Sequence, residues 1–271
     1  MNTYFTLRSR RIRLSVTFLI FASLFTTQRS YAQENFSPAI EDNSFYIEEA
    51  YNQEPGVVQH IFTSEHLFEN PHATNFTFTQ EVPIYGLTNQ LSYTVAYPTV
   101  ANGTTVLYAN YRYQLLYKHD WASVSPRISL YLPVNSVTGN LGRMSAQINI
   151  PVSKRLSNHF VTHVNFGATF DRCEWDHGNP ISTSWTLGGS MIWLSSENTN
   201  FLFETMAIVN PTHGEENMYI VSPGTRFALN FGKTQVVPGI GFPMELSNAQ
   251  WILGVFFYFS VELPYWTAEE Q

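Results

Sequence analysis

The chain has 271 residues, of which 44% are hydrophobic, 15% aromatic and only 13% charged, and its formal net charge is −7. Soluble domains contain about 25% charged residues on average, so this is a low-charge, aromatic-rich sequence. The acidic balance argues against a nucleic-acid partner, because phosphates are bound by basic surfaces. A single cysteine, Cys173, excludes a framework of internal disulfides.

Residues 1–32 have the features of a cleaved signal peptide. Arginines precede an apolar run over residues 14–25, and Ser30 and Ala32 form a small-x-small cleavage pattern that places the mature start at Gln33. The run is about 12 residues long, too short for a helix to cross a bilayer core of about 30 Å. The basic residues of this segment are Arg8, Arg10, Arg11, Arg13 and Arg29. We therefore predict export, followed by removal of the segment.

Residues 33–55 precede the first predicted strand. Part of this stretch, residues 42–53, is rich in acidic and amide side chains, including Glu48, Glu49 and Gln53. It is predicted to form either a periplasmic arm or a short plug, with a disordered lead as an equal alternative.

Beyond residue 56, apolar and polar side chains alternate with the two-residue period of a β-strand. At residues 251–262, Trp251 and Phe257 belong to a wholly apolar face, whereas Ser260 and Glu262 lie on the other. About a dozen such segments between polar loops, with almost no stretch of helical period, are typical of outer-membrane barrels. The predicted strands are 57–62, 75–82, 91–97, 106–117, 124–132, 143–152, 159–170, 183–194, 200–209, 220–230, 234–243 and 251–263.

The predicted fold is all-β, a single transmembrane antiparallel up-and-down β-barrel of about 12 strands over residues 56–263, with a periplasmic tail at 264–271. An even strand number leaves both ends of the barrel in the periplasm. Predicted external loops, such as 171–182 and 244–250, are mostly longer than the periplasmic turns, as expected. Pro126 and Pro238 cannot donate to a strand ladder, so they require bulges or different strand boundaries.

Polar faces of the predicted strands would line the lumen. Arg112, Arg127 and Arg143 lie on successive strands and would form a basic patch, while Glu204 and Glu262 come from later strands. The electric field of these luminal charges could orient a passing solute or bias ion selectivity. The alternative is a salt-bridged lumen that closes the barrel. The predicted pore-lining residues are Asn110, Arg112, Gln114, Arg127, Arg143, Gln147, His163, Glu204, Arg226 and Glu262.

No cofactor or metal site is predicted. Asp171, Cys173 and His177 lie together in one predicted external loop, but their spacing matches no established metal motif, and a solvated acidic loop is the better interpretation. No nucleophile elbow, Rossmann or P-loop glycine pattern occurs, so we predict no enzymatic activity.

Several strand-and-turn clusters form a recognisable set: QEVPIY at 80–85, LSY at 91–93, NYRYQ at 110–114, SPRIS at 125–129 and NIPV at 149–152. In these clusters the chain resembles the phenol-degradation MetA-pathway family of bacterial outer-membrane proteins. The resemblance extends over nearly the whole mature chain, and it implies outer-membrane transport or channel function, with small aromatic or apolar compounds as candidate solutes.

The hypothesis is therefore an outer-membrane channel or transporter whose partners are outer-membrane lipid, the barrel-assembly machinery and a small solute, with no nucleic acid. Three alternatives stay open: a closed structural barrel, an outer-membrane lipid-modifying enzyme, and a soluble secreted β-sandwich. The enzyme would need a serine with a histidine base, and His163 with Asn165 lies on a predicted luminal face, away from lipid. A sandwich would need a dry core between two sheets with polar outer faces, and the mostly uncharged polar faces here suit an enclosed lumen better than an open surface.

Overall fold

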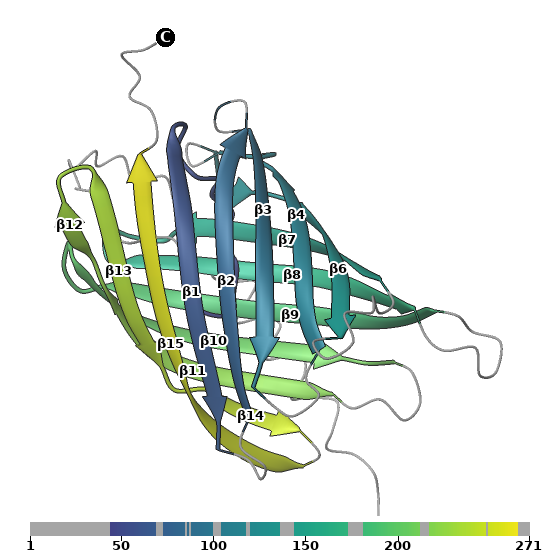
Figure 1. The fold of residues 1–271 in the computed structure, drawn as a ribbon. Helices are drawn as coiled ribbons and strands as arrows, with labels where there is room; N and C mark the ends of the chain where they lie inside the picture. Colours follow the sequence, from purple (N-terminus) through teal and green to yellow (C-terminus); the bar gives the residue numbers. More distant parts are fainter. Residues whose placement is uncertain are drawn as a thin grey trace, which may run out of the picture. The chain divides into compact units, whose positions relative to one another are not determined.

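The computed structural model describes residues 44–68, 73–84, 86, 88–99, 104–117, 120–135, 144–172, 181–211, 217–247 and 249–264. Across this part of the chain a single antiparallel sheet closes on itself, because its first and last strands pair along their whole length (Figure 1). No helix among these residues is long and apolar enough to span a membrane. The predicted signal peptide and residues 265–271 of the predicted tail lie outside the described residues.

The sheet contains fifteen labelled strands, each hydrogen-bonded to its neighbours in the wall. They are β1 (Val57–Leu67), β2 (Ala73–Ile84), β3 (Asn89–Pro98), β4 (Thr104–Tyr113), β5 (Ser123–Val124), β6 (Arg127–Asn135), β7 (Ser145–Arg155), β8 (Phe160–Arg172), β9 (Ile181–Leu194), β10 (Thr199–Val209), β11 (Met218–Phe227), β12 (Leu229–Phe231), β13 (Thr234–Gly241), β14 (Met244–Ser247) and β15 (Gln250–Pro264).

Three short interruptions divide single barrel strands into two labelled pieces. They separate β5 from β6 at residues 125–126, β11 from β12 at Ala228, and β13 from β14 at residues 242–243. The wall is therefore a closed antiparallel barrel of 12 strands, which confirms the predicted fold class. Val152 and Ser153 of β7 pair with β5, and earlier residues of β7 pair with β6, so the interrupted strand keeps its place in the wall.

Several predicted boundaries were wrong; β1, for example, extends to Leu67 instead of ending at residue 62. Backbone chemistry explains one of the differences. The strand predicted at 106–117 ends at Tyr113, where its amide donates to the carbonyl of Pro126 (3.0 Å). Pro126 has no N–H to return, so the regular ladder is interrupted there and β6 begins at Arg127. Pairing resumes beyond the interruption as a single bridge between Leu116 and Val124. Residues 244–247, predicted as part of an external loop, form β14 and pair with β11 and β15. Pro238 stays within β13, opposite Phe259.

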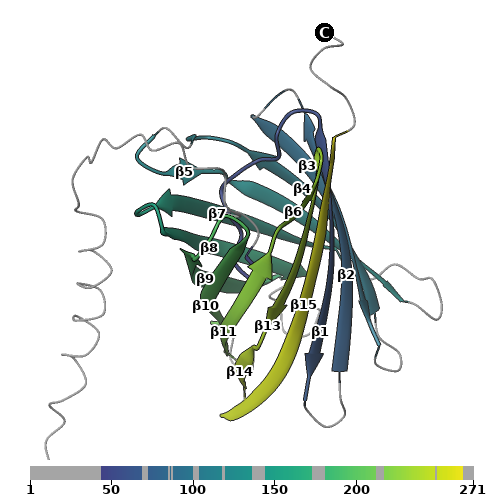
Figure 2. The same cartoon turned by 90° about the vertical axis from the view of Figure 1, so that its left-hand side faces the viewer.

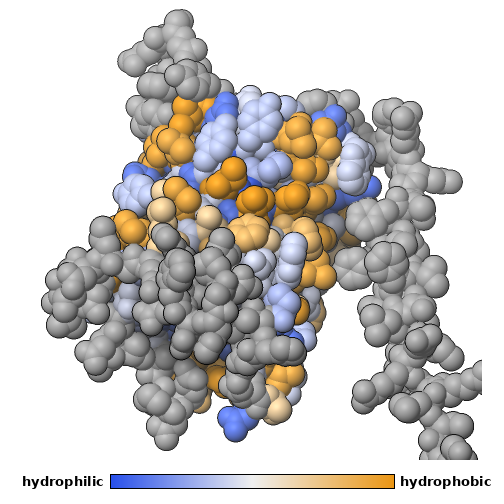
Figure 3. Space-filling view, turned by 90° about the vertical axis from the view of Figure 1, so that its right-hand side faces the viewer, coloured by the Kyte–Doolittle hydropathy of each residue, from blue (hydrophilic) through white to orange (hydrophobic). Residues whose placement is uncertain are grey.

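The wall has an apolar outer face and a polar inner face. Exposed large apolar side chains gather on the outer surface, one side of which Figure 3 shows. They include Phe62, Leu91, Leu130, Ile148, Phe166, Leu187, Phe203, Leu253 and Phe257. Buried polar side chains alternate with them and include Gln59, Gln90, Arg112, Ser129, Asn149, His163, Glu204, Ser222, Arg226 and Ser260. This inverted arrangement is what a membrane-spanning barrel requires, because lipid solvates the outside.

The two ends of the barrel differ. The start of β1 and the end of β15 lie side by side at one end, here called the terminal end, since Val57 pairs with Pro264 (Figure 1). Most connections at the terminal end are short, as between β7 and β8 or β9 and β10. At the opposite end the strands are separated by longer stretches of sequence, as between β6 and β7 and between β8 and β9.

Candidate functional site: the barrel lumen and the segment inside it

Residues 44–56, here called the luminal segment, precede β1 and run inside the barrel (Figure 2). Ile47 and Ala50 are almost fully buried, and Glu49 and Gln53 are nearly so. The segment runs through the lumen to the terminal end, where the chain turns into β1. Of residues 33–55, the described residues 44–53 lie inside the barrel, and the choice among arm, plug and disordered lead for the whole stretch stays a prediction.

Glu204 of β10 anchors the beginning of the luminal segment. Its carboxylate accepts hydrogen bonds from the backbone amides of Phe45 (3.1 Å), Tyr46 (3.0 Å) and Ile47 (3.1 Å). Glu204 is only 1% exposed, so its charge depends on these donors and on the nearby Arg226. Hydrogen bonds to a charged group contribute roughly 1.5–3 kcal/mol each, so Glu204 is a strong polar anchor of the segment.

Glycines in the inner wall make room for two apolar side chains of the segment. A Cβ added at Gly188 of β9 would lie 2.3 Å from Cδ1 of Ile47. A Cβ at Gly224 of β11 or Gly241 of β13 would lie 2.4 Å or 2.8 Å from the ring of Phe45. Real Cβ atoms do not approach so closely, so any larger residue would displace the segment.

The ring of Phe45 also packs on aromatic residues of β15. Its centroid lies 5.1 Å from that of Phe256 and 5.8 Å from that of Tyr258, while Tyr46 lies 5.2 Å from Phe256. Both rings join a small apolar cluster of the inner wall that contains Val237. The Tyr46 hydroxyl donates to Glu65 of β1. Apolar burial and polar anchoring therefore fix the same three residues, 45–47.

The acidic pair of the segment meets a basic pair of the wall. Glu49 lies 3.4 Å from Nη1 of Arg112, and Glu48 forms ion pairs with both Arg112 (3.7 Å) and Arg127. The side chain of Arg112 is 5% exposed and that of Arg127 18% exposed. Such buried ion pairs are costly to break from one side, because the remaining charge is left in a poorly solvated site.

Amide and hydroxyl side chains of the wall bind the segment's backbone. Asn165 of β8 accepts from the amide of Glu48 (2.8 Å) and donates to its carbonyl (2.7 Å). Ser153 of β7 accepts from the amide of Ala50 (2.7 Å) and also contacts Nδ1 of His163 (2.6 Å). Gln114 donates to the Ala50 carbonyl (2.8 Å). These contacts fix the segment by its backbone, which is bound by side chains of the wall.

Near the terminal end, glutamines bind the last part of the segment. The amide of Gln53 donates to Gln90 of β3 (2.7 Å), whose own side chain donates to Glu81 of β2 (2.8 Å). The side chain of Gln53 donates to Gln59 of β1 (2.5 Å), which in turn donates to Glu262 of β15 (3.3 Å). The segment is thus held from its first to its last residues.

Comparison with solved structures finds bacterial outer-membrane barrels. The NanC porin has a TM-score of 0.55 and 9% identity, covering 75% of this chain and 98% of that chain. An outer-membrane channel from Pseudomonas putida F1 has a TM-score of 0.55 and 11% identity, covering 82% and 99%. The KdgM porin has a TM-score of 0.50 and 10% identity, covering 75% and 97%. The chain has the fold of outer-membrane β-barrels.

The sequence itself matches no family model and no curated protein. The resemblance to the MetA-pathway family is therefore not confirmed, and the likeness to solved barrels is one of fold.

The structure places nine of the ten predicted pore-lining residues on the inner side of the barrel or at its terminal end, and Arg143 lies outside the described residues. The basic pair meets Glu48 and Glu49 of the luminal segment. Glu262 accepts from Gln59, and Gln147 accepts from Arg127 (3.0 Å). Asn110 donates to Ser92 (3.1 Å), and Arg226 to Asn200 (3.4 Å).

Of the residues that hold the segment, Arg112, Gln114, Arg127 and Glu204 were among the predicted pore-lining residues, whereas Asn165 and Ser153 were not. Asn165 and Ser153 stand among many uncharged polar residues of inner faces, and nothing in the alternation marks them. The glycines at 188, 224, 239 and 241 gave a signal, because each occupies an inward position where other strands carry larger side chains. Inward glycines are a sign that another part of the chain approaches the wall closely.

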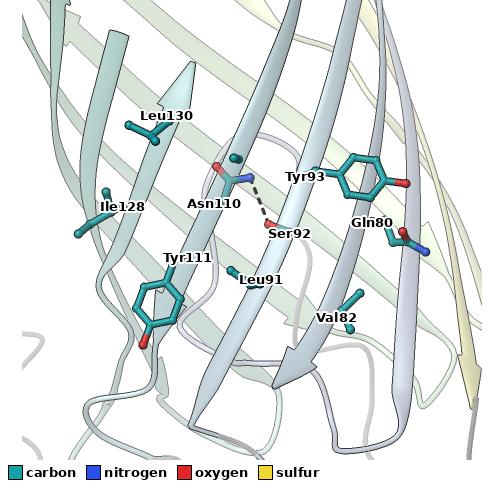
Figure 4. Close-up of a pocket in the computed structure, with 10 residues that line it drawn as sticks. Gln80, Val82, Leu91, Ser92, Tyr93, Asn110, Tyr111, Ile128 and Leu130 are labelled. Atoms are coloured by element: carbon teal, nitrogen blue, oxygen red, sulfur yellow. Dashed lines mark hydrogen bonds between the residues drawn. The ribbon is translucent and has the colours of Figure 1, made fainter. Parts of the chain in front are cut away.

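The outer wall has a shallow groove of about 400 Å³ across β2, β3, β4 and β6 (Figure 4). Leu91, Tyr93, Tyr111 and Leu130 line it around the small side chain of Ala109. These side chains belong to the outward-facing set, so the groove is part of the lipid-facing surface and is separate from the lumen.

Proposed function

We propose that this protein is an outer-membrane channel for small solutes, closed at rest by its luminal segment. The observation that carries the proposal is the docking of residues 44–53 in the lumen through Glu204, the inward glycines and the basic pair. A barrel of 12 strands is wider than the eight-stranded barrels whose interiors are filled by side chains alone. Without the segment, its polar lumen would hold water.

The proposed solutes are small aromatic or apolar compounds. The support is the site of the Phe45 ring, which lies on bare glycine backbone and against Phe256 and Tyr258. An aromatic ring of a solute could occupy the same site once the segment leaves, with offset or edge contacts to these rings.

A closed structural barrel is the second candidate, because the ion pairs and hydrogen bonds of the segment also stabilise a filled interior. The two candidates differ in whether the segment leaves. A structural barrel keeps it docked at all times, whereas a channel must release it during transport.

The membrane location and the conductance are tested on the full chain. We expect the protein to remain in urea-washed outer membranes and to migrate faster on a gel unheated than boiled, because the closed ladder resists detergent. Reconstituted in a planar bilayer, the wild type should show a closed baseline with brief openings. Extraction by urea with no mobility shift would contradict the membrane location, and a bilayer silent at all voltages would favour the structural barrel.

A further inference from the structure

We propose that Arg112 and Arg127 form a binding site for a small organic carboxylate, and that the luminal segment closes the channel by placing Glu48 in this site as a tethered competitor. The inference rests on the proposed function and names a solute group that the lumen recognises. A carboxylate that enters the site would replace the side chain of Glu48 and favour release of the segment.

The two arginines are direct neighbours across the wall. Arg112 of β4 and Arg127 of β6 occupy the same position of the strand pair, and both side chains face inward. Two guanidinium groups at one level would repel each other in an enclosed lumen, so the site requires anions. The planar forked donors of arginine match a carboxylate in geometry as well as charge.

The site offers more donors than the segment uses. In the described part of the chain, Nε of Arg112, Nε of Arg127 and the Ser129 hydroxyl are buried without a hydrogen-bond partner. Ser129 is fully buried and lies two residues along β6 from Arg127, on the same face. Unpaired buried groups cost free energy, and within the same part of the chain Oε2 of Glu48 also lacks a hydrogen-bond partner. A carboxylate that is free to orient in the site would satisfy donors that the tethered Glu48 leaves unused.

Charge balance changes when the segment leaves. Arg112 still has Glu81 nearby, which contributes to its electrostatic environment. Within the described residues, Arg127 then keeps the hydrogen bond to the amide oxygen of Gln147 (3.0 Å). A half-buried guanidinium without an anion is strongly disfavoured, so the open channel should take up a carboxylate from solution.

The surroundings of the site suit an organic anion better than an inorganic one. Beyond Asn110 and Ser129, the next inward pair along β4 and β6 is Tyr108 and Tyr131, whose rings meet edge to face at 4.6 Å. Both phenols lie close enough to Arg127 to interact with it electrostatically. Arginine, hydroxyl and phenol thus follow one another along the inner wall, and a solute with a carboxylate head and an unsaturated body fits that order.

Accessibility of a cysteine in the segment measures its release. In a Cys173→Ser background, Ala50→Cys places a thiol at a position that is 0% exposed while the segment is docked. We expect benzoate to raise the maleimide labelling rate by about tenfold, the population change that corresponds to about 1.4 kcal/mol. Benzyl alcohol and sodium chloride at equal ionic strength should leave the rate unchanged. If the thiol at 50 disturbs docking, Ser44→Cys serves as a second reporter.

Variants of the site separate anion binding from general loosening. Arg127→Gln should raise basal labelling and remove the benzoate effect, whereas Glu48→Gln should raise basal labelling and lower the benzoate concentration needed for half the effect. Arg155→Gln is the matched control, because Arg155 lies at the end of β7 and donates to carbonyls of its own turn. Equal responses of the wild-type reporter to benzoate and benzyl alcohol would overturn the proposal.

Failure of this inference is distinguishable from failure of the channel proposal. The variant lacking residues 44–53 should bind benzoate in calorimetry, and Arg127→Gln in the same variant should not. If that variant conducts ions but binds no benzoate, the carboxylate site is refuted and the channel stands. If it binds benzoate but does not conduct, the carboxylate site stands and the channel proposal is refuted.

Discussion

Deletion of residues 44–53 is expected to convert the barrel from a closed state with brief openings into a steadily conducting pore. The deletion removes Phe45 and Ile47 from their glycine pockets, Glu48 and Glu49 from the basic pair, and the amides that bind Glu204. The wall keeps its own ladder, since β1 pairs with β2 and β15 through residues beyond 56. Conductance in planar bilayers and swelling of proteoliposomes measure the change.

The matched control replaces residues 44–53 by an equal number of glycine and serine residues. A flexible insert of the same length lacks the anchors, so it should conduct nearly as well as the deletion. If the deletion stays as closed as the wild type while its unheated gel mobility shows a folded barrel, the segment is not what closes the lumen. In that case the structural-barrel alternative would be favoured.

Gly241→Val is expected to expel the segment by a single added side chain. Its Cβ would lie 2.8 Å from two ring atoms of Phe45 and 3.3 Å from the Ser222 hydroxyl, with no backbone atom among these nearest contacts. Overpacking of this kind costs about 1–3 kcal/mol, and each 1.4 kcal/mol changes the docked population about tenfold. We therefore expect long-lived openings in single-channel recordings, with barrel stability little changed.

The matched control for this substitution is Gly189→Val. A Cβ at Gly189 meets only the His163 carbonyl, at an ordinary 3.8 Å. It should leave conductance at the wild-type level. Combining Gly241→Val with Phe45→Ala should open the channel no further than Phe45→Ala alone, because the clash partner is gone and the two changes are coupled. An additive result would mean that the two residues do not meet.

The wall of this protein follows directly from its sequence, whereas the content of its lumen does not. Successive side chains of a strand point to opposite faces, so the alternation of apolar and polar residues is enough to assign each residue to a face. Residues such as Phe257 and Ser260 could therefore be assigned to opposite faces without a structure. Interruptions at residues 125–126 and 242–243 depend on prolines and pairing, and only the first was anticipated.

The luminal segment has no alternation of polar and apolar residues from which its contacts could be predicted. Glu48 and Glu49 gave no indication of which arginines they would meet, because ion pairs between distant parts of a chain depend on how the chain folds back. The same holds for Glu204, whose partners are backbone amides that any sequence would provide. The arginine patch was identified, but the sequence assigned it no counter-charge.

A reversible cross-link between the segment and the wall tests most directly whether the segment closes the channel. The hydroxyls of Ser44 and Ser190 lie 2.9 Å apart, so Ser44→Cys with Ser190→Cys in a Cys173→Ser background should form a disulfide with little rearrangement. The oxidised protein should show fewer openings than the wild type, and reduction should restore wild-type gating in the same bilayer. Equal conductance before and after reduction, with the disulfide verified by mass, would contradict a segment that must leave the lumen for solute to pass.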